Sequence, residues 1–310
     1  MAIPMLSRSF VLSGTIYLPL VAGYLLKRAG KVPETLSTSL VRLATWTIQP
    51  VAIAITFWGL TFPREAIALP LTAVGLSLSL LPPAWGLSCW HAHAPSQRGS
   101  YLAAVIFSNI GLTLGGFLCL LFLGEEGLGL SVLYMLSFMP LFVTVGFSIG
   151  RRYRGPDAQG GHLNVLNLVL PAAVGVGFLL NLWGPPRPDV LTGVNRILVP
   201  ITSASYAFAI GLSLRLRSVL QYRKEALSVS LLKFGLSPPL GLGIGTLLGL
   251  EGTALKVVLV EAAMPVALNA LVLAHLFDLD RDLANACWIA TTLAVLPLSL
   301  LLGLLLPLLQ

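Results

Sequence analysis

The sequence predicts an all-α membrane protein of ten transmembrane helices, built as two inverted repeats of five helices each. Three observations predict this fold: a composition that is 56% hydrophobic and 10% charged, ten long apolar stretches, and a hydrophilic segment that divides them five and five. A soluble globular domain carries about 25% charged residues, so this chain cannot cover a water-facing surface. Its three cysteines are spread along the chain and form no disulfide framework. Soluble enzymes, disordered chains and disulfide-rich secreted modules are therefore excluded.

Nine stretches contain no Asp, Glu, Lys or Arg, and each is near or above the roughly 18 to 20 residues that a membrane-spanning helix needs. In chain order they are 9–26, 43–63, 66–97, 99–124, 127–150, 158–186, 197–214, 234–250 and 283–310. A further stretch, 257–277, is interrupted by a single acid, Glu261. Counted with it, the ten spans leave no room for a soluble domain.

The basic residues predict the orientation of the spans in the bilayer. Twelve of them fall in the loops after odd-numbered spans: Lys27, Arg28, Lys31, Arg98, Arg151, Arg152, Arg154, Arg215, Arg217, Arg223, Lys224 and Arg281. The opposite side has Arg8, Arg64 and Arg187, with Lys256 at a helix edge. By the positive-inside rule the first set is cytoplasmic, which places both termini outside the cell membrane. Orientation thus explains the net charge of +7 better than a nucleic-acid partner does.

The longest hydrophilic segment, Arg151 to His162, lies almost at mid-chain. It predicts a first five-helix repeat over residues 1–150, a cytoplasmic linker over 151–163 and a second repeat over 164–310.

Matching features in the two halves favour a true repeat. Leu18-Pro19 in the first span has a counterpart in Leu170-Pro171 of the sixth, and Pro50 of the second span has one in Pro200 of the seventh. A repeat with five crossings must be inverted relative to its copy, and inverted repeats are typical of secondary transporters, whose halves rock about a central site. The alternative is an asymmetric structural or sensory bundle.

Two spans are expected to break near the middle of the membrane. The ninth contains Glu261, Pro265 and Asn269 within nine residues, and the fourth contains Asn109 followed by three glycines, Gly111, Gly115 and Gly116. Proline removes a backbone hydrogen bond, and glycine tolerates open backbone conformations. If both helices unwind and cross, the positive ends of their half-helices point into one cavity. That arrangement suits an anionic substrate, with a proton or cation nearby.

In these motifs the sequence resembles the auxin efflux carrier family, and the resemblance extends over nearly its whole length. The similar segments are Leu18 to Lys27, Gln49-Pro50, Asn109-Ile110-Gly111, Gly124 to Leu128, Ala209 to Leu214 after Pro200, and Glu261 to Pro265 with Asn269 and Ala274. The resemblance implies a fold similar to that of the bile acid sodium symporters. Spans one, two, six and seven would form a scaffold, spans three to five and eight to ten would form a transport domain, and spans four and nine would cross at the substrate site. It also implies transport of organic anions such as auxin or dicarboxylates, commonly by dimers.

The chain departs from the family pattern at two places. Family members usually have a proline seven residues after the span-four asparagine, where this chain has Gly116. In the sodium-coupled relatives two amide residues follow the span-nine methionine, where this chain has Pro265 and Val266. The chain therefore offers few oxygen ligands for sodium, and we expect transport to be driven by a proton or by the substrate's own gradient. A sodium-coupled symporter of the bile acid type is the alternative.

These considerations select the candidate site residues. The substrate or ion is expected at Asn109, Gly111, Gly115, Gly116, Glu261, Met264, Pro265 and Asn269, while Pro50 and Pro200 are helix-break or scaffold residues. Glu261 is the main candidate, because a charge near the bilayer centre costs at least roughly 2.5 to 3.5 kcal/mol on insertion scales. The alternatives are a structural acid for Glu261 and interhelical hydrogen bonds for the two asparagines.

The remaining polar residues carry weaker signals. We expect Arg42, Arg196, Lys233 and Lys256 to snorkel toward the membrane interface. The less favoured alternative is that one of them reaches the cavity and selects an anion. His91 and His93 have no third ligand beside them, so neither a metal nor any other cofactor is expected. No span carries a hydrolase or metalloprotease motif, so the chain is not expected to be an enzyme and has no catalytic residues. An intramembrane enzyme or a membrane sensor is a less favoured alternative.

Overall fold

The computed structural model describes residues 11, 13–33, 35–60, 67–91, 94–155, 169–214 and 216–306. Among the residues named above, Arg8, Arg64, His93, Arg215 and linker positions 156–163 lie outside these ranges. Every regular element of the described part is a helix, and its extended pairing is limited to one isolated antiparallel bridge, between Ser108 and Val266. The prediction of an all-helical chain is confirmed for these residues.

Six helical segments of the described part are long and apolar enough to cross a membrane. They are Thr35–Trp58, Ala68–Trp90, Leu114–Tyr153, Asp189–Ser213, Arg223–Leu247 and Arg281–Gly303. The other expected spans appear as shorter helices: α2 (Leu18–Arg28) for the first, α11 (Val169–Trp183) for the sixth, and broken helices for the fourth and ninth. Ten spans in two inverted repeats therefore stay a prediction.

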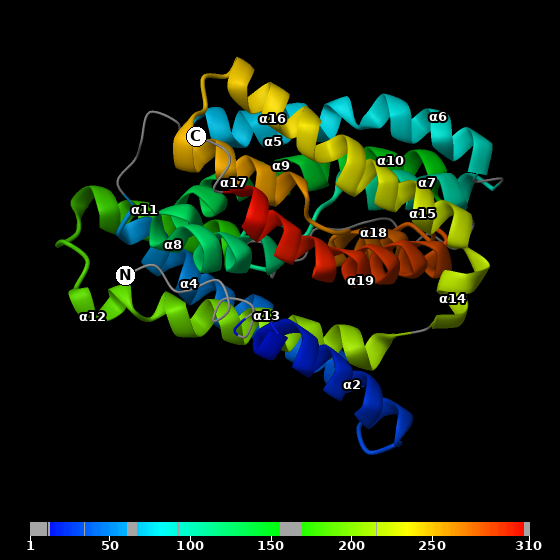
Figure 1. The fold of residues 1–310 in the computed structure, drawn as a ribbon, viewed down its shortest axis with the longest axis horizontal. Coiled ribbons are helices and arrows are strands. Elements are labelled where there is room, and N and C mark those ends of the chain that lie inside the picture. Colours follow the sequence, from blue (N-terminus) through cyan, green and yellow to red (C-terminus); the bar gives the residue numbers. More distant parts are fainter. Residues whose placement is uncertain are drawn as a thin grey trace. The chain divides into compact units, whose positions relative to one another are not determined.

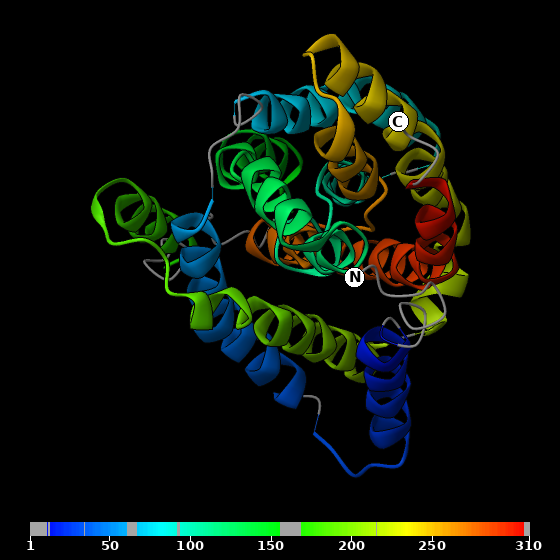
Figure 2. The same ribbon diagram turned by 60° about the vertical axis from the view of Figure 1, so that its left-hand side comes forward.

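The chain divides into two compact units, which are described separately. The first consists of Met1–Pro63, Gly111–Val132 and Leu163–Leu214. It contains α2, α3 (Thr35–Leu43), α4 (Gln49–Trp58), most of α8 (Leu114–Met135), α11, α12 (Asp189–Thr192) and α13 (Asn195–Ser213). Helix α13 packs against α2 and α3, and α11 packs against α4 (Figures 1 and 2).

Glycines and buried polar groups hold the first unit together. A Cβ on Gly23 of α2 would collide with the carbonyl oxygen of Phe208, and one on Gly211 of α13 would collide with that of Leu20. The two helices can therefore approach to backbone contact, as small residues allow in membranes. Deeper in the unit, Asn195 donates a hydrogen bond of 2.8 Å to the Thr56 hydroxyl.

The second unit consists of Arg64–Ile110, Leu133–His162 and Arg215–Gln310. Its helices are α5 (Ala68–Ser79), α6 (Leu81–His91), α7 (Pro95–Ile106), α9 (Phe138–Leu141), α10 (Phe147–Tyr153), α14 (Leu216–Gln221), α15 (Arg223–Leu231), α16 (Ser237–Leu247), α17 (Gly252–Ala262), α18 (Leu268–Leu276) and α19 (Arg281–Leu305). Helix α16 packs between α5 and α17, and α19 packs against α7 and α15 (Figure 1).

An aromatic row and a capped helix end order this unit. The rings of Phe107, Phe142, Phe147 and Phe277 follow one another edge to face, with centroids 5.2 to 5.8 Å apart. At the start of α19, Asp280 accepts a hydrogen bond of 2.8 Å from the Leu283 N–H and another of 2.8 Å from the Tyr222 hydroxyl. Burial and this carboxylate raise the pKa of Tyr222 to about 12.

Candidate functional site

The candidate site is a pair of helix interruptions joined by backbone hydrogen bonds. Helix α7 ends at Ile106, and the chain becomes helical again at Leu114. Helix α17 ends at Ala262, and α18 begins at Leu268. The interruptions run antiparallel: the Asn109 N–H donates to the Pro265 carbonyl at 2.8 Å, and the Ala267 N–H donates to the Phe107 carbonyl at 2.9 Å. The breaks expected near Asn109 and Pro265 are therefore present.

The pairing explains how the breaks persist in an apolar environment. Proline has no N–H and disfavours helix in the residue before it, so Pro265 ends α17. In the hydrocarbon region the freed backbone groups must be satisfied by the protein. Besides the two bonds between the interruptions, the Val266 N–H donates to the Thr291 hydroxyl of α19 at 3.1 Å.

The fourth span breaks without the family proline. Gly111 has a φ of 71°, a left-handed conformation that favours glycine. The Gly116 N–H donates to the Gly111 carbonyl, and a Cβ on Gly116 would collide with that same oxygen. A proline at position 116 could not make this hydrogen bond, because it has no N–H. In this chain the helix is therefore interrupted by the hydrogen-bonded turn from Gly111 to Gly116, and not by a proline. Gly115 is buried in the first turn of α8. These three glycines belong to the first unit.

Glu261 and Met264 are fully buried at the end of α17, with 0% of each residue exposed. Glu261 interacts electrostatically with Tyr134, and its backbone carbonyl accepts a hydrogen bond from the Met264 N–H at 3.3 Å. The burial expected for this acid is therefore observed, while its role stays a prediction.

The two asparagines of the candidate site are half-buried: Asn109 lies in the span-four interruption, and Asn269 lies in the first turn of α18. Within the described part of the chain, neither side-chain amide makes a hydrogen bond; Asn109 bonds only through its backbone N–H. The alternative role as interhelical hydrogen-bonding groups is therefore not observed among these residues. By contrast, Asn181 of the first unit donates to the carbonyls of Trp58 and Leu60 at 3.0 and 2.8 Å.

The two prolines expected as helix-break or scaffold residues both lie in helices of the first unit. Pro50 lies inside the continuous helical segment Thr35–Trp58, directly after its π-helical turn Ala44–Ile48. Pro200 lies inside α13, which continues through it. A break at Pro200 is therefore not observed, and the scaffold role is the one that stays.

Lys233 is the residue for which the expectation was wrong. It does not snorkel to the interface: it is fully buried, and its Nζ donates a hydrogen bond of 2.6 Å to the Ser108 hydroxyl in the span-four interruption. A stretch bounded at charged residues begins after Lys233, whereas the helical segment runs from Arg223 to Leu247 with Lys233 near its middle. The double proline Pro238-Pro239, which widens the preceding turn Leu232–Leu236 into a π-helical one, was the available signal.

Arg42 and Arg196 are both exposed, and their snorkelling to the membrane interface stays a prediction. Arg42 is exposed over the ring of Trp46, and Arg196 is exposed and paired with Glu125 at 3.5 Å.

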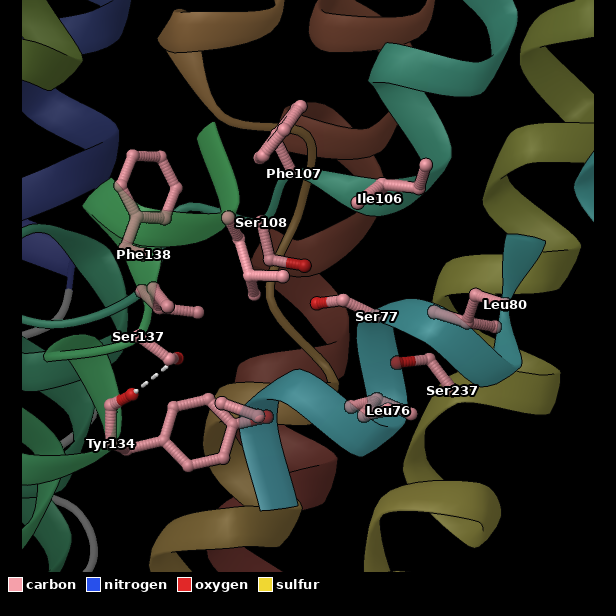
Figure 3. A pocket seen from close by; sticks show the side chains of 13 residues that line it. Leu76, Ser77, Leu80, Ile106, Phe107, Ser108, Tyr134, Ser137, Phe138 and Ser237 are labelled. Carbon is pink, nitrogen blue, oxygen red and sulfur yellow. Dashed lines mark hydrogen bonds between the residues drawn. The ribbon is translucent and has the colours of Figure 1, made fainter. Parts of the chain in front are cut away.

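A pocket of the second unit opens beside the interruption of span four (Figure 3). Its polar lining consists of Ser77 of α5, Ser108, Tyr134, Ser137 and Ser237 of α16. Ser237 donates to the Ala262 carbonyl at 2.7 Å, and Ser137 donates to the Tyr134 carbonyl at 3.2 Å. Two residues of the pocket lining are thus close to predicted site residues: Ser108 precedes Asn109 in the sequence, and Ser237 is hydrogen-bonded to Ala262, which follows Glu261. None of the predicted site residues lines the pocket itself.

The chain is similar to known membrane transport proteins over part of its length. Residues 163–302 match the model of a family described as membrane transport protein. The chain is 30% identical over 183 residues to an uncharacterized transporter of Methanothermobacter thermautotrophicus, and the match covers 57% of this chain and 58% of that relative. It is 27% identical over 213 residues to an uncharacterized transporter of Methanocaldococcus jannaschii, a match that covers 66% of this chain and 67% of the relative.

These matches confirm the resemblance found in the sequence. The family model, together with the six long apolar helices, also supports a multi-pass integral membrane protein. Residues 163–302 of the chain are thus similar to the membrane transport protein family.

Proposed function

We propose that this protein is a secondary transporter that carries a small organic anion across the membrane by alternating access, coupled to a proton. The observation that carries the proposal is the pair of helix interruptions, 107–113 and 263–267, held together by backbone hydrogen bonds. Transporters place unwound backbone where it lines a substrate cavity, and the positive ends of half-helices stabilise anions there.

The polar groups beside the interruptions fit this function. The amides of Asn109 and Asn269 each have two donors and an acceptor, and within the described residues no protein group occupies them. We assign them to the substrate, together with the backbone at Pro265; a role for Gly111, Gly115 and Gly116, which belong to the first unit, stays a prediction. Buried Glu261, beside Met264 and one turn from Pro265, is the group assigned to the proton.

The division of the chain supports a scaffold and a moving part. The predicted first, second, sixth and seventh spans fall in the first unit, and the third, eighth, ninth and tenth fall in the second. Residues 111–132, which the family pattern assigns to the transport domain, are grouped with the first unit instead. A homodimer in the plasma membrane, with both termini outside and spans four and nine crossing between inverted repeats, completes the proposal.

Uptake into proteoliposomes tests the function. Purified protein would be reconstituted, and uptake of labelled carboxylic acids, from auxin-like acids to dicarboxylates, would be measured under a proton gradient, a sodium gradient or neither. We expect uptake that a proton gradient stimulates and that empty liposomes lack. Stimulation by sodium alone would favour the bile-acid-type symporter, and failure of every acid to enter would contradict the proposal.

Asparagine variants separate binding from folding. N109A and N269A are expected to weaken uptake while leaving thermal unfolding nearly unchanged, because neither amide holds a protein partner in the described residues. N181A is the matched control, since its amide bonds two backbone carbonyls. It should lower stability by about 1–3 kcal/mol without changing the substrate concentration that gives half-maximal uptake.

A further inference from the structure

A buried cation lies directly behind the pocket of the second unit. Lys233 has 0% of its surface exposed and sits near the middle of the apolar segment Arg223–Leu247. A charged side chain at such a position costs at least roughly 2.5 to 3.5 kcal/mol on insertion scales, and residues of this kind mark substrate or ion sites by default. The proposed transport function so far makes no use of it.

The hydrogen bond of Lys233 has a defined direction. An ammonium group has three donors and no acceptor, so Ser108 must accept the 2.6 Å bond from Nζ. The Ser108 hydroxyl proton is then left to donate to another group. Ser108 is half-buried and lines the pocket, so this donor is accessible where the lysine itself is not.

Lys233 has no countercharge in the described part of the chain. The ion pairs found there join Arg196 to Glu125 and Arg281 to Asp278, and no carboxylate lies within 4.0 Å of the lysine. A buried ammonium without a fixed partner is stabilised by an anion that comes close to it.

The pocket offers a second donor next to Ser108. The Ser77 hydroxyl makes no hydrogen bond within the described residues, and Figure 3 shows that it and Ser108 both point into the pocket. Ser137 and Ser237 donate to backbone carbonyls and are therefore occupied. Two hydroxyl donors backed by one positive charge match a carboxylate, which only accepts hydrogen bonds and carries one negative charge.

We infer that Ser108, backed by Lys233, binds the carboxylate of the transported anion in this pocket, an inference that rests on the proposed transport function. Ser108 contacts the carboxylate through its hydroxyl, Ser77 provides the second hydrogen bond, and Lys233 supplies the charge that excludes neutral molecules. The specificity of the transporter is thus set by a residue of the segment Arg223–Leu247 in addition to the predicted residues of spans four and nine.

Ligand-induced thermal stabilisation of the purified protein tests this site. The probes are pairs of equal shape that differ in charge: benzoate with benzamide, and succinate with succinamide. We expect the carboxylates to stabilise the wild-type protein and the amides to have little effect. K233M should weaken carboxylate binding roughly 30-fold or more, because one partner of a buried charge pair is lost. S108A should weaken it about tenfold, as expected for a hydrogen bond to a charged group.

Matched variants control for folding. K256M removes a half-buried lysine of α17 away from the pocket, and S230A removes a hydroxyl that bonds only its own helix at Ala226; both should bind like wild type. K233M should unfold at or above the wild-type temperature, since replacing a buried charge by an apolar chain of similar length is neutral or stabilising. K233R retains the charge and should retain the preference for carboxylate over amide.

The outcomes distinguish this inference from the proposed function. Equal binding of carboxylate and amide, no binding of any probe, or wild-type affinity in K233M would overturn the role of Lys233 and Ser108. Carboxylate uptake into proteoliposomes that persists unchanged in K233M would also overturn it while leaving the transport function intact. Carboxylate binding that depends on Lys233, in a protein that moves no anion across the bilayer, would support the site and contradict transport.

Discussion

The interruptions of spans four and nine reach the same result by different chemistry. In span nine, Pro265 removes a backbone donor and ends α17, and the chain is then held by bonds to Asn109, Phe107 and Thr291. In span four no proline is present, and the break is formed by left-handed Gly111 and by the Gly116 N–H that closes on its carbonyl.

The difference indicates what a break in an apolar helix requires. Proline prevents helix, but a break is stable only where the freed backbone groups find partners, because no water is available to them. Glycine permits the same conformation without enforcing it. Span four thus depends on local closure and close packing, whereas span nine depends on its neighbours. Variants that change one break and leave the other intact can therefore test these two requirements separately.

The largest loss of transport should come from replacing Glu261, the acidic residue beside the break in span nine. E261Q keeps the shape of the side chain and removes its ability to exchange a proton, so proton-driven uptake should be abolished while the protein stays folded. The measurement is uptake under an imposed proton gradient, with thermal unfolding as the control for folding. Wild-type uptake with wild-type pH dependence in E261Q would remove Glu261 from the mechanism.

The largest loss of folding stability should come from disturbing the turn in span four in which the Gly116 N–H bonds to the Gly111 carbonyl. G116A places a Cβ against the Gly111 carbonyl, a backbone atom that cannot rotate away. We expect a loss of roughly 3 kcal/mol, the upper end for overpacking. G175A is the matched control, because nothing lies within 4 Å of its new Cβ. If both variants unfolded at the same temperature as the wild type, the turn from Gly111 to Gly116 would not be what closes the break.

The site could be located from sequence where a single residue type determines the backbone. Pro265 and the glycines after Asn109 indicated both breaks, because helix breakers are rare and unambiguous within apolar stretches. Glu261 was recognised since it interrupts an otherwise uncharged span. The fold class followed from composition alone.

Lys233 could not be placed in the same way. The rule that a charge ends a span moved it to a helix end, although the apolar segment continues on both sides of it. Its hydrogen bond to Ser108 joins residues 125 positions apart, and the spacing of apolar residues along the sequence cannot predict a contact of this kind. Ser77 and Ser237 were missed for the same reason, because serines in apolar helices usually bond their own backbone.

The support that span nine receives from its neighbours can be removed at Thr291. T291V deletes the hydroxyl that accepts from the Val266 N–H and leaves that donor buried, so we expect a loss of about 1–3 kcal/mol. T246V is the control, since Thr246 is exposed and bonds only its own helix. Both are compared by chemical unfolding in detergent. Equal stability of the two variants would mean that Val266 finds another partner and that α19 does not hold the break.

The smallest effect should follow from removing the proline itself. P265A restores a backbone donor, yet the bonds from Asn109 to the carbonyl of residue 265 and from Ala267 to Phe107 do not depend on the ring. If partners rather than the proline maintain the break, stability should change by no more than about 1 kcal/mol, the typical size of the proline effect on the unfolded chain. Uptake should persist at a reduced rate. Complete loss of uptake with a large gain in stability would mean that α17 and α18 had joined into one helix, and that proline, not pairing, makes span nine break.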